Sequence, residues 1–173
     1  MTILVLNGSP RKNGNVANRL RKELEKYSGE TIIWENVCDL NFSFCKGCMA
    51  CRSKESCILP EDDAHKIAEE IKNCDMIFVG TPVYWGNMNG KLKALFDRLV
   101  GVLMAESKLG IPIPLHKGKK AVVVTSCTTP FPFNYLCGQS SGAFRAVKEI
   151  LKSSGFKIIR KANISNTKRK ARK

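Results

Sequence analysis

The chain has 173 residues, of which 43% are hydrophobic and 25% charged, a globular composition that excludes wholesale disorder and collagen-like repeats. Its length suits one domain, and no apolar stretch reaches the roughly 18 residues that a membrane span needs. The net charge is +14, and eight of the 29 basic residues lie between Lys157 and Lys173 with no acidic residue among them. More than half of the excess charge therefore belongs to this C-terminal strip.

The eight cysteines have to be interpreted together with the cellular compartment. The first residues lack the basic region and the apolar length of a secretory signal, so we expect a cytoplasmic protein with reduced thiols. Metal ligation, redox chemistry and core packing are then the available roles, and a disulfide scaffold is disfavoured.

Apolar runs alternate with segments of helical periodicity along the chain. The predicted strands are residues 2–6, 31–37, 76–80, 121–124 and 156–159. The predicted helices are residues 16–27, 64–71, 92–103 and 143–154, while residues 41–58 show no period and residues 110–120 read as a loop. This βαβαβαβαβ order predicts one open, doubly wound parallel sheet with helices on both faces.

Only 14 residues, Arg160 to Lys173, follow the last predicted strand, and the end of this tail has no apolar face. A final covering helix is therefore not expected. Our hypothesis is that a second subunit or a rearranged tail covers the sheet face that such a helix would cover. We expect a homodimer or homotetramer with no membrane partner.

The loop after the first strand carries an anion-binding pattern, Gly8-Ser9-Pro10-Arg11-Lys12-Asn13-Gly14-Asn15. It leads directly into a helix, whose N-terminus favours a phosphate through free N–H groups and the helix dipole. The pattern is neither G-x-G-x-x-G nor a P-loop, which disfavours a Rossmann dinucleotide site and an NTPase. The alternative is a polar turn in which Asn15 caps the helix.

Two more loops lie at the carboxyl ends of predicted strands, where doubly wound sheets bind ligands. Pro82-Val83-Tyr84-Trp85-Gly86-Asn87-Met88 offers two large aromatic residues and a glycine against which a flat conjugated ring can lie. Ser126 begins the corresponding loop after the fourth strand. The alternative for Tyr84 is that it closes the edge of the core.

Three segments together resemble the NADPH-dependent FMN reductases of flavodoxin-like fold. They are Gly8-Ser9-Pro10-Arg11 with Gly14-Asn15, then Thr81-Pro82-Val83-Tyr84-Trp85-Gly86, then Leu92-Lys93 with Phe96-Asp97-Arg98. The resemblance covers most of residues 1–160 and implies a five-stranded sheet of order 2-1-3-4-5. We therefore expect an FMN-binding domain over residues 1–160, with a cysteine-rich loop at 41–58, and a basic tail over residues 161–173.

The resemblance also implies the cofactor-binding residues. Those expected at the FMN phosphate are Ser9, Arg11, Asn13, Gly14, Asn15 and Val16, where Val16 offers only its backbone N–H in place of the family's frequent hydroxyl. Those expected at the ribityl chain and ring are Pro82, Val83, Tyr84, Trp85, Gly86, Asn87 and Ser126. The chemistry requires no general acid–base pair, so no catalytic side chain is assigned.

Cys45, Cys48, Cys51 and Cys57 form C-x2-C-x2-C-x5-C, four thiols within 13 residues. This compact pattern favours a [4Fe–4S] cluster over structural zinc, which usually uses two separated knuckles. Zinc and a metal-free segment remain alternatives, because a helix also places residues 45 and 48 on one side. The same spacing in this loop resembles the iron–sulfur flavoproteins, a branch of the same family that implies electron transfer between cluster and FMN.

The remaining candidate residues have simpler interpretations. The single cysteines 38, 74, 127 and 137 are expected as small core residues. For His65 and His116 we expect a solvated or capping role, and for Asp97-Arg98 a helix surface or subunit contact. The basic tail is interpreted as a solvated terminus rather than a nucleic-acid-binding element, since aromatic interleaving is missing.

The sequence thus predicts a cytoplasmic FMN-dependent oxidoreductase that passes electrons between a [4Fe–4S] cluster and FMN. A ferredoxin or NAD(P)H is the expected redox partner. The first alternative is a cluster-free NAD(P)H-dependent FMN or quinone reductase. A more distant alternative is a basic docking or nucleic-acid-associated protein.

Overall fold

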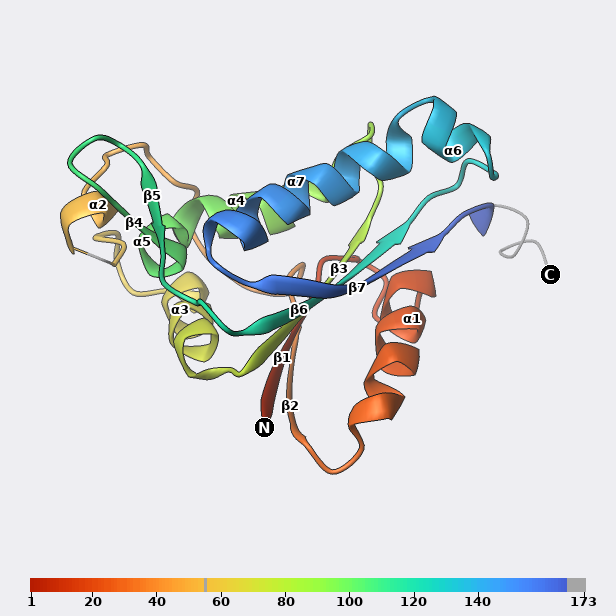
Figure 1. Ribbon diagram of the computed structural model, residues 1–173, viewed down its shortest axis with the longest axis horizontal. Coiled ribbons are helices and arrows are strands. Elements are labelled where there is room, and N and C mark those ends of the chain that lie inside the picture. The colour runs from red at the N-terminus through yellow and green to blue at the C-terminus, as the bar shows by residue number, and fades with distance from the viewer. Residues whose placement is uncertain (55, 168–173) are drawn as a thin grey trace.

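The computed structural model describes residues 1–54 and 56–167 (Figure 1). In chain order the elements are β1 (Thr2–Asn7), α1 (Asn15–Leu24), η1 (Glu25–Tyr27), β2 (Thr31–Asn36), α2 (Cys51–Lys54), α3 (Asp63–Asn73), β3 (Met76–Pro82), α4 (Gly90–Arg98), α5 (Val100–Leu103), β4 (Met104–Glu106), β5 (Pro112–Pro114), β6 (Lys120–Ser126), α6 (Phe133–Leu136), α7 (Gln139–Ser153) and β7 (Lys157–Ile164). None of the helices in the described residues combines the length and apolarity needed to cross a bilayer.

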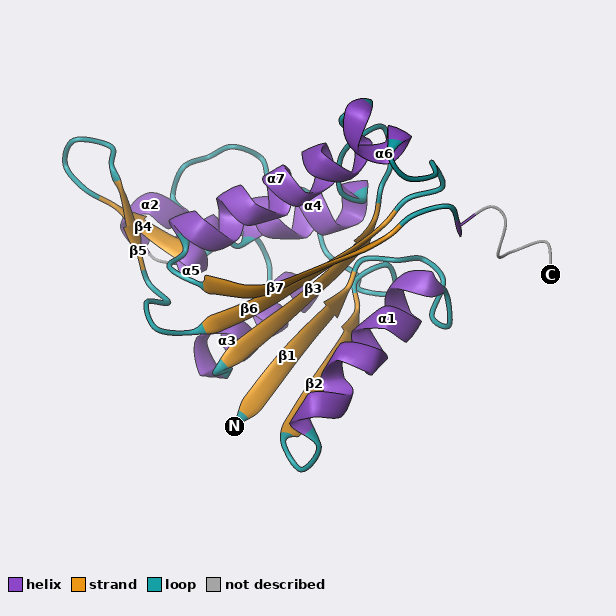
Figure 2. Ribbon diagram, turned by 45° about the vertical axis from the view of Figure 1, so that its right-hand side comes forward, coloured by secondary structure: helices purple, strands orange, loops and turns teal. Residues whose placement is uncertain are grey.

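Five strands form one parallel sheet in the order β2-β1-β3-β6-β7 (Figure 2). This is the predicted flavodoxin-like order 2-1-3-4-5, and the prediction is confirmed. The strand numbers differ because β4 and β5 form a separate two-stranded antiparallel ribbon. Part of that ribbon lies within the segment predicted as a loop.

The alternation of side chains along the central strands divides the core into two layers. Leu4, Leu6, Ile77 and Val79 point towards α3, α4, α5 and α7, where they pack with the apolar faces of these helices. Their neighbours, among them Val5 and Phe78, point to the opposite face and pack against α1. Strands buried on both faces give the continuous apolar runs seen in the sequence.

Helix α1 covers much of the sheet face for which a second subunit or a rearranged tail was expected. Val122 and Val124 of β6 are at most 2% exposed on this face. Next to them on β7, Ala162 is buried and Arg160 reaches Glu23 of α1 at 3.4 Å. The described residues therefore bury this part of the sheet within one chain, and the oligomeric state stays a prediction.

Strand β7 is longer than predicted and continues from Lys157 to Ile164. The expected boundary between domain and tail, at residue 160, thus falls inside a strand. Beyond it, Asn166 donates its backbone N–H to Thr129 and Thr167 donates to Cys127. The end of the basic tail, residues 168–173, lies outside the described residues.

Candidate functional site

The loop after β1 is fixed by short-range hydrogen bonds. The side chain of Asn7 accepts the N–H of Ser9 at 3.2 Å, and the Ser9 hydroxyl accepts the N–H of Arg11 at 3.2 Å. Gly8 donates its N–H to Gly80 of β3 at 2.7 Å, which holds the loop against the neighbouring strand. These bonds turn the chain at the carboxyl end of β1 and lead it into α1.

Helix α1 begins without a side-chain cap. Its N-cap residue is Gly14, and no side chain of the described residues accepts a hydrogen bond there. The alternative of a turn capped by Asn15 is therefore wrong. Since the first backbone N–H groups of a helix have no intrahelical partners, this N-terminus offers donors and a favourable dipole to an anion.

The loop after β3 is a tight hairpin. The backbones of Tyr84 and Asn87 exchange two hydrogen bonds of 2.9 Å around Trp85 and Gly86, whose φ angles are 52° and 74°. Positive φ at both central residues is the pattern of a type I′ turn, which glycine adopts easily and tryptophan adopts at a cost of roughly 1–3 kcal/mol. The strained Trp85 side chain is fully exposed.

Neighbouring contacts hold this hairpin in place. Val83 donates its N–H to Ser126 at the end of β6, at 2.8 Å. On the other side, Asn89 donates its backbone N–H to the Thr81 hydroxyl and caps α4 by accepting from Lys91 and Leu92. The loops after β3 and β6 are thereby joined at the same edge of the sheet.

A cavity of about 140 Å³ lies where these three loops meet. Eight of the thirteen predicted cofactor-binding residues line it: Ser9, Arg11, Asn15, Val16, Pro82, Val83, Tyr84 and Ser126. The other five, Asn13, Gly14, Trp85, Gly86 and Asn87, lie in the same loops and do not line this cavity. The cofactor role of all thirteen stays a prediction.

Three further residues of the cavity wall were not among the predicted cofactor-binding residues: Pro10, which lies in the predicted anion-binding loop, Thr128 and Thr167. Thr128 lies in the loop that Ser126 begins, so its place in that loop was a usable signal. Thr167 lies within the segment assigned to the tail, and its hydroxyl donates to the Cys127 carbonyl at 3.2 Å. It reaches the cavity because β7 runs alongside β6 for its full length.

The four clustered cysteines lie on the segment before α3, in which Cys51 is the first residue of the short helix α2. Cys45 and Cys48 are exposed, and Cys51 and Cys57 are half-buried. Within residues 1–54 and 56–167, no three cysteine, histidine or acidic side chains lie close enough together to hold a metal ion. Their role as cluster ligands stays a prediction.

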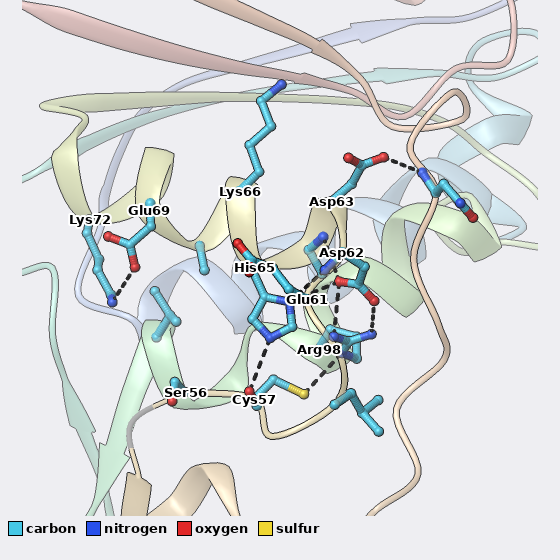
Figure 3. Close-up of a pocket in the computed structure, with 15 residues that line it drawn as sticks. Ser56, Cys57, Glu61, Asp62, Asp63, His65, Lys66, Glu69, Lys72 and Arg98 are labelled. Atoms are coloured by element: carbon cyan, nitrogen blue, oxygen red, sulfur yellow. Dashed lines mark hydrogen bonds and ion pairs between the residues drawn. The ribbon is translucent and has the colours of Figure 1, made fainter.

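A second cavity, of about 710 Å³, lies beside this segment and not at the sheet edge where the loops after β1, β3 and β6 meet (Figure 3). Arg98, Asp62, His65 and Cys57 lie together in its wall. His65 and Asp62 form a reciprocal capping box at the start of α3, as expected of a capping histidine. Burial disfavours the charged form of Asp62, but the hydrogen bonds from Arg98 and from backbone N–H groups outweigh it and lower its pKa.

Two expectations for single residues are wrong. Arg98 is not a surface residue: only 3% of it is exposed, whereas Asp97 lies on the surface beside Lys93. Cys137 is exposed, whereas Cys74 and Cys127 are core residues as expected. His116 is not solvated but is buried against Phe156, and it bonds the Val102 carbonyl of α5 at 2.9 Å, which agrees with the other expected role, capping.

Burial raises the pKa of the Cys74 thiol to about 11, so this side chain stays protonated at neutral pH. It packs as a small apolar residue in the core.

The chain is similar in sequence to proteins named iron-sulfur flavoproteins. The chain is 37% identical to an iron-sulfur flavoprotein of Methanosarcina thermophila over 105 residues, which cover 58% of this chain and 53% of that protein. It is 30% identical to an iron-sulfur flavoprotein of Clostridioides difficile strain 630 over 150 residues, which cover 82% of this chain and 67% of that protein. The chain spans about half the length of the first curated relatives it matches.

The fold is shared with solved flavoenzymes. The structure of an FMN-dependent NADH-azoreductase from Bacillus anthracis, in complex with FMN, superimposes with a TM-score of 0.73 at 14% identity and covers 96% of this chain and 87% of that one. The model of the NADPH-dependent FMN reductase family matches residues 1–129. The chain therefore belongs to the NADPH-dependent FMN reductase family.

Proposed function

We propose that this chain is an FMN-dependent oxidoreductase that passes electrons between a [4Fe–4S] cluster and FMN. The observation that carries the FMN part is the cavity at the carboxyl edge of the sheet, into which the uncapped start of α1 and the loops after β3 and β6 converge. Family membership, together with relatives named iron-sulfur flavoproteins, supports the proposal.

The phosphate is assigned to the loop after β1. The start of α1 supplies backbone donors and a dipole, and Arg11 supplies a guanidinium from the cavity wall. Ser9 is 94% buried and lines the same wall. A dianionic phosphate is the group that gains most from this set of donors.

The isoalloxazine ring is assigned to the open side of the cavity. About 140 Å³ is below the roughly 300–1,000 Å³ of whole-ligand pockets, so the cavity itself suits the phosphate and ribityl end. The ring would then lie on the exposed hairpin of residues 84–87. A role in contacting the ring also accounts for the strained and fully exposed Trp85, because strain of this kind is concentrated at ligand sites.

The cluster is assigned to Cys45, Cys48, Cys51 and Cys57. Their chemistry fits, since four free thiols on one short segment are the donors that iron–sulfur clusters use. The Cys57 sulfur already accepts an N–H from Arg98, which is the kind of bond that stabilises a ligating thiolate. When bound, FMN exchanges one or two electrons and the cluster one, so the pair connects two-electron and one-electron chemistry.

The redox partners follow from this chemistry. A ferredoxin-like protein or NAD(P)H is proposed as the electron donor, and the protein is proposed to work in the cytoplasm as a homo-oligomer. The chain's own contribution is to bind the cofactors, to hold their orientation and to set their surroundings.

The proposal is tested by anaerobic purification, followed by determination of iron, sulfide and flavin in one preparation. We expect about four irons, about four sulfides and one FMN per chain, as a cubane cluster with one flavin requires. FMN without iron would favour the cluster-free NAD(P)H-dependent FMN or quinone reductase. A preparation without flavin, and unable to bind added FMN, would refute both.

A further inference from the structure

Arg98, the last residue of α4, is a buried cation with four hydrogen bonds. Its side chain is fully buried, a position that is costly for a charge unless its donors are paired. Nη1 donates to Asp62 at 2.8 Å and to the Ser43 carbonyl at 2.6 Å, and Nη2 donates to Asp62 at 3.1 Å. The third nitrogen, Nε, donates its N–H to the sulfur of Cys57 at 3.2 Å.

These partners come from both ends of the cysteine segment. Ser43 lies two residues before Cys45, and Cys57 is the last of the four cysteines. Asp62 caps α3 and also accepts the N–H of Ser43 at 3.1 Å. In Figure 3 the guanidinium of Arg98 lies between Asp62 and Cys57. One side chain thus fastens the two ends of this segment to the helical layer.

His65 strengthens the same arrangement from α3. Its Nδ1 accepts the backbone N–H of Asp62 at 3.1 Å, and its Nε2 lies 3.1 Å from the Cys57 carbonyl. Cys57 is therefore held through its backbone by His65 and approached at its sulfur by Arg98. An arrangement that served only to pair Asp62 with a cation would not require a donor at the sulfur.

We propose that Arg98 is a positioning residue for the iron–sulfur centre. Its side chain holds the two ends of the cysteine segment together and donates a charge-assisted hydrogen bond to the Cys57 sulfur. This inference rests on the proposed function. Hydrogen bonds to ligating sulfurs are among the factors that set cluster potentials. A donor that carries a positive charge stabilises the more negative, reduced centre, so Arg98 raises the reduction potential of the cluster.

Arg98→Lys separates this role from plain ion pairing. Lysine keeps the charge opposite Asp62 but lacks the planar fork that serves Asp62, Ser43 and Cys57 together. In the anaerobic holoprotein we expect the cluster midpoint potential to fall by about 59 mV, the equivalent of a tenfold change for one electron. The FMN potential serves as an internal reference and is expected to stay constant.

Two control variants complete the test. Asp97→Asn changes the exposed neighbour on the same helix and is expected to leave the potential and the stability unchanged. Asp62→Asn weakens the ion pair but leaves the donor to Cys57, so it is expected to lower the melting temperature without the potential shift. If Arg98→Lys retains iron and the wild-type potential, or if Asp62→Asn shifts the potential equally, the proposal is overturned.

A second readout does not depend on the cluster. In iron-free protein we expect backbone hydrogen exchange in residues 43–57 to be faster in Arg98→Lys than in wild type and in Asp97→Asn, with exchange in the central strands unchanged. Equal exchange in all three proteins would overturn the positioning role. If Arg98→Lys does not fold, Arg98→Gln, which keeps an N–H donor but no charge, replaces it in both measurements. Absence of iron from wild-type protein would refute the proposed function, whereas the exchange result decides the role of Arg98 separately.

Discussion

Gly101, in α5, allows the cysteine segment to approach the core. A Cβ atom at this position would lie 2.6 Å from the carbonyl oxygen of Cys51 and 2.9 Å from its Cβ. Both atoms belong to or adjoin the backbone of α2, so no side-chain rotation relieves the clash. To restore ordinary contact, Cys51 has to move by about 0.8 Å, which is the difference between the 2.6 Å approach and the 3.4 Å limit of normal contact.

The variant Gly101→Ala is best compared with Gly90→Ala. Gly90 also lies in a helix, and in the described part of the chain no heavy atom lies within 4 Å of its would-be Cβ. Both variants gain the helix propensity of alanine, up to about 1 kcal/mol, so their difference isolates the overpacking. Overpacking costs about 1–3 kcal/mol, and we expect the unfolding free energy of Gly101→Ala to lie that far below that of Gly90→Ala.

Urea denaturation of both iron-free variants measures this difference. In the anaerobic holoproteins, Gly101→Ala is also expected to lose iron while FMN stays bound, because Cys51 is displaced and the loops after β1, β3 and β6 are not touched. An unfolding free energy of Gly101→Ala equal to or above that of Gly90→Ala would refute the packing argument. Full iron content in Gly101→Ala would refute the assignment of Cys51 as a ligand.

Three further predictions concern single residues. Arg11→Ala should weaken FMN binding roughly tenfold or more and riboflavin binding little, since a charge-assisted hydrogen bond to the phosphate contributes about 1.5–3 kcal/mol. Fluorescence titrations measure both affinities, with Lys12→Ala, a change of an exposed side chain, as the control. Equal losses of affinity for the two flavins would place the phosphate elsewhere. Cys45→Ser should abolish cluster absorbance and leave FMN bound, and loss of both would contradict two separate sites. Burial lowers the pKa of His116, helped by Lys119 and opposed by the Val102 carbonyl, so its contribution to stability is full above about pH 6.5 and is lost as pH falls. His116→Gln should therefore flatten the urea-derived stability curve between about pH 7 and pH 5, and a wild-type slope would contradict this.

The parts of the fold that could be predicted are those in which local sequence and tertiary structure agree. The apolar runs around Val5, Phe78 and Val123 are buried on both faces, and their alternation with periodic helices leaves few possible topologies. The ribbon of β4 and β5 was missed because Pro112-Ile113-Pro114, with two prolines in three residues, lacks the sequence features of a strand, although it pairs with residues 104–106.

In the candidate site, too, the residues that follow a recognisable strand could be predicted, whereas those that depend on distant partners could not. The loops after β1, β3 and β6 were found because each directly follows a recognisable strand, and parallel strands end at one edge. Arg98 was misassigned because its partners Ser43, Cys57 and Asp62 lie 55, 41 and 36 residues away in the chain. In the sequence Arg98 directly follows the charged Asp97, which suggests a helix surface. Nothing in the helical periodicity indicates that a sulfur from another segment lies beside it.

In the proposed function, electrons pass between the cluster and FMN within this chain. The most direct test mixes anaerobic holoprotein with a one-electron reductant and follows the flavin absorbance over time, in wild type and in Cys45→Ser. We expect slower flavin reduction in Cys45→Ser, because the route through the cysteine segment is lost while FMN stays bound. Equal rates in the two proteins would contradict it.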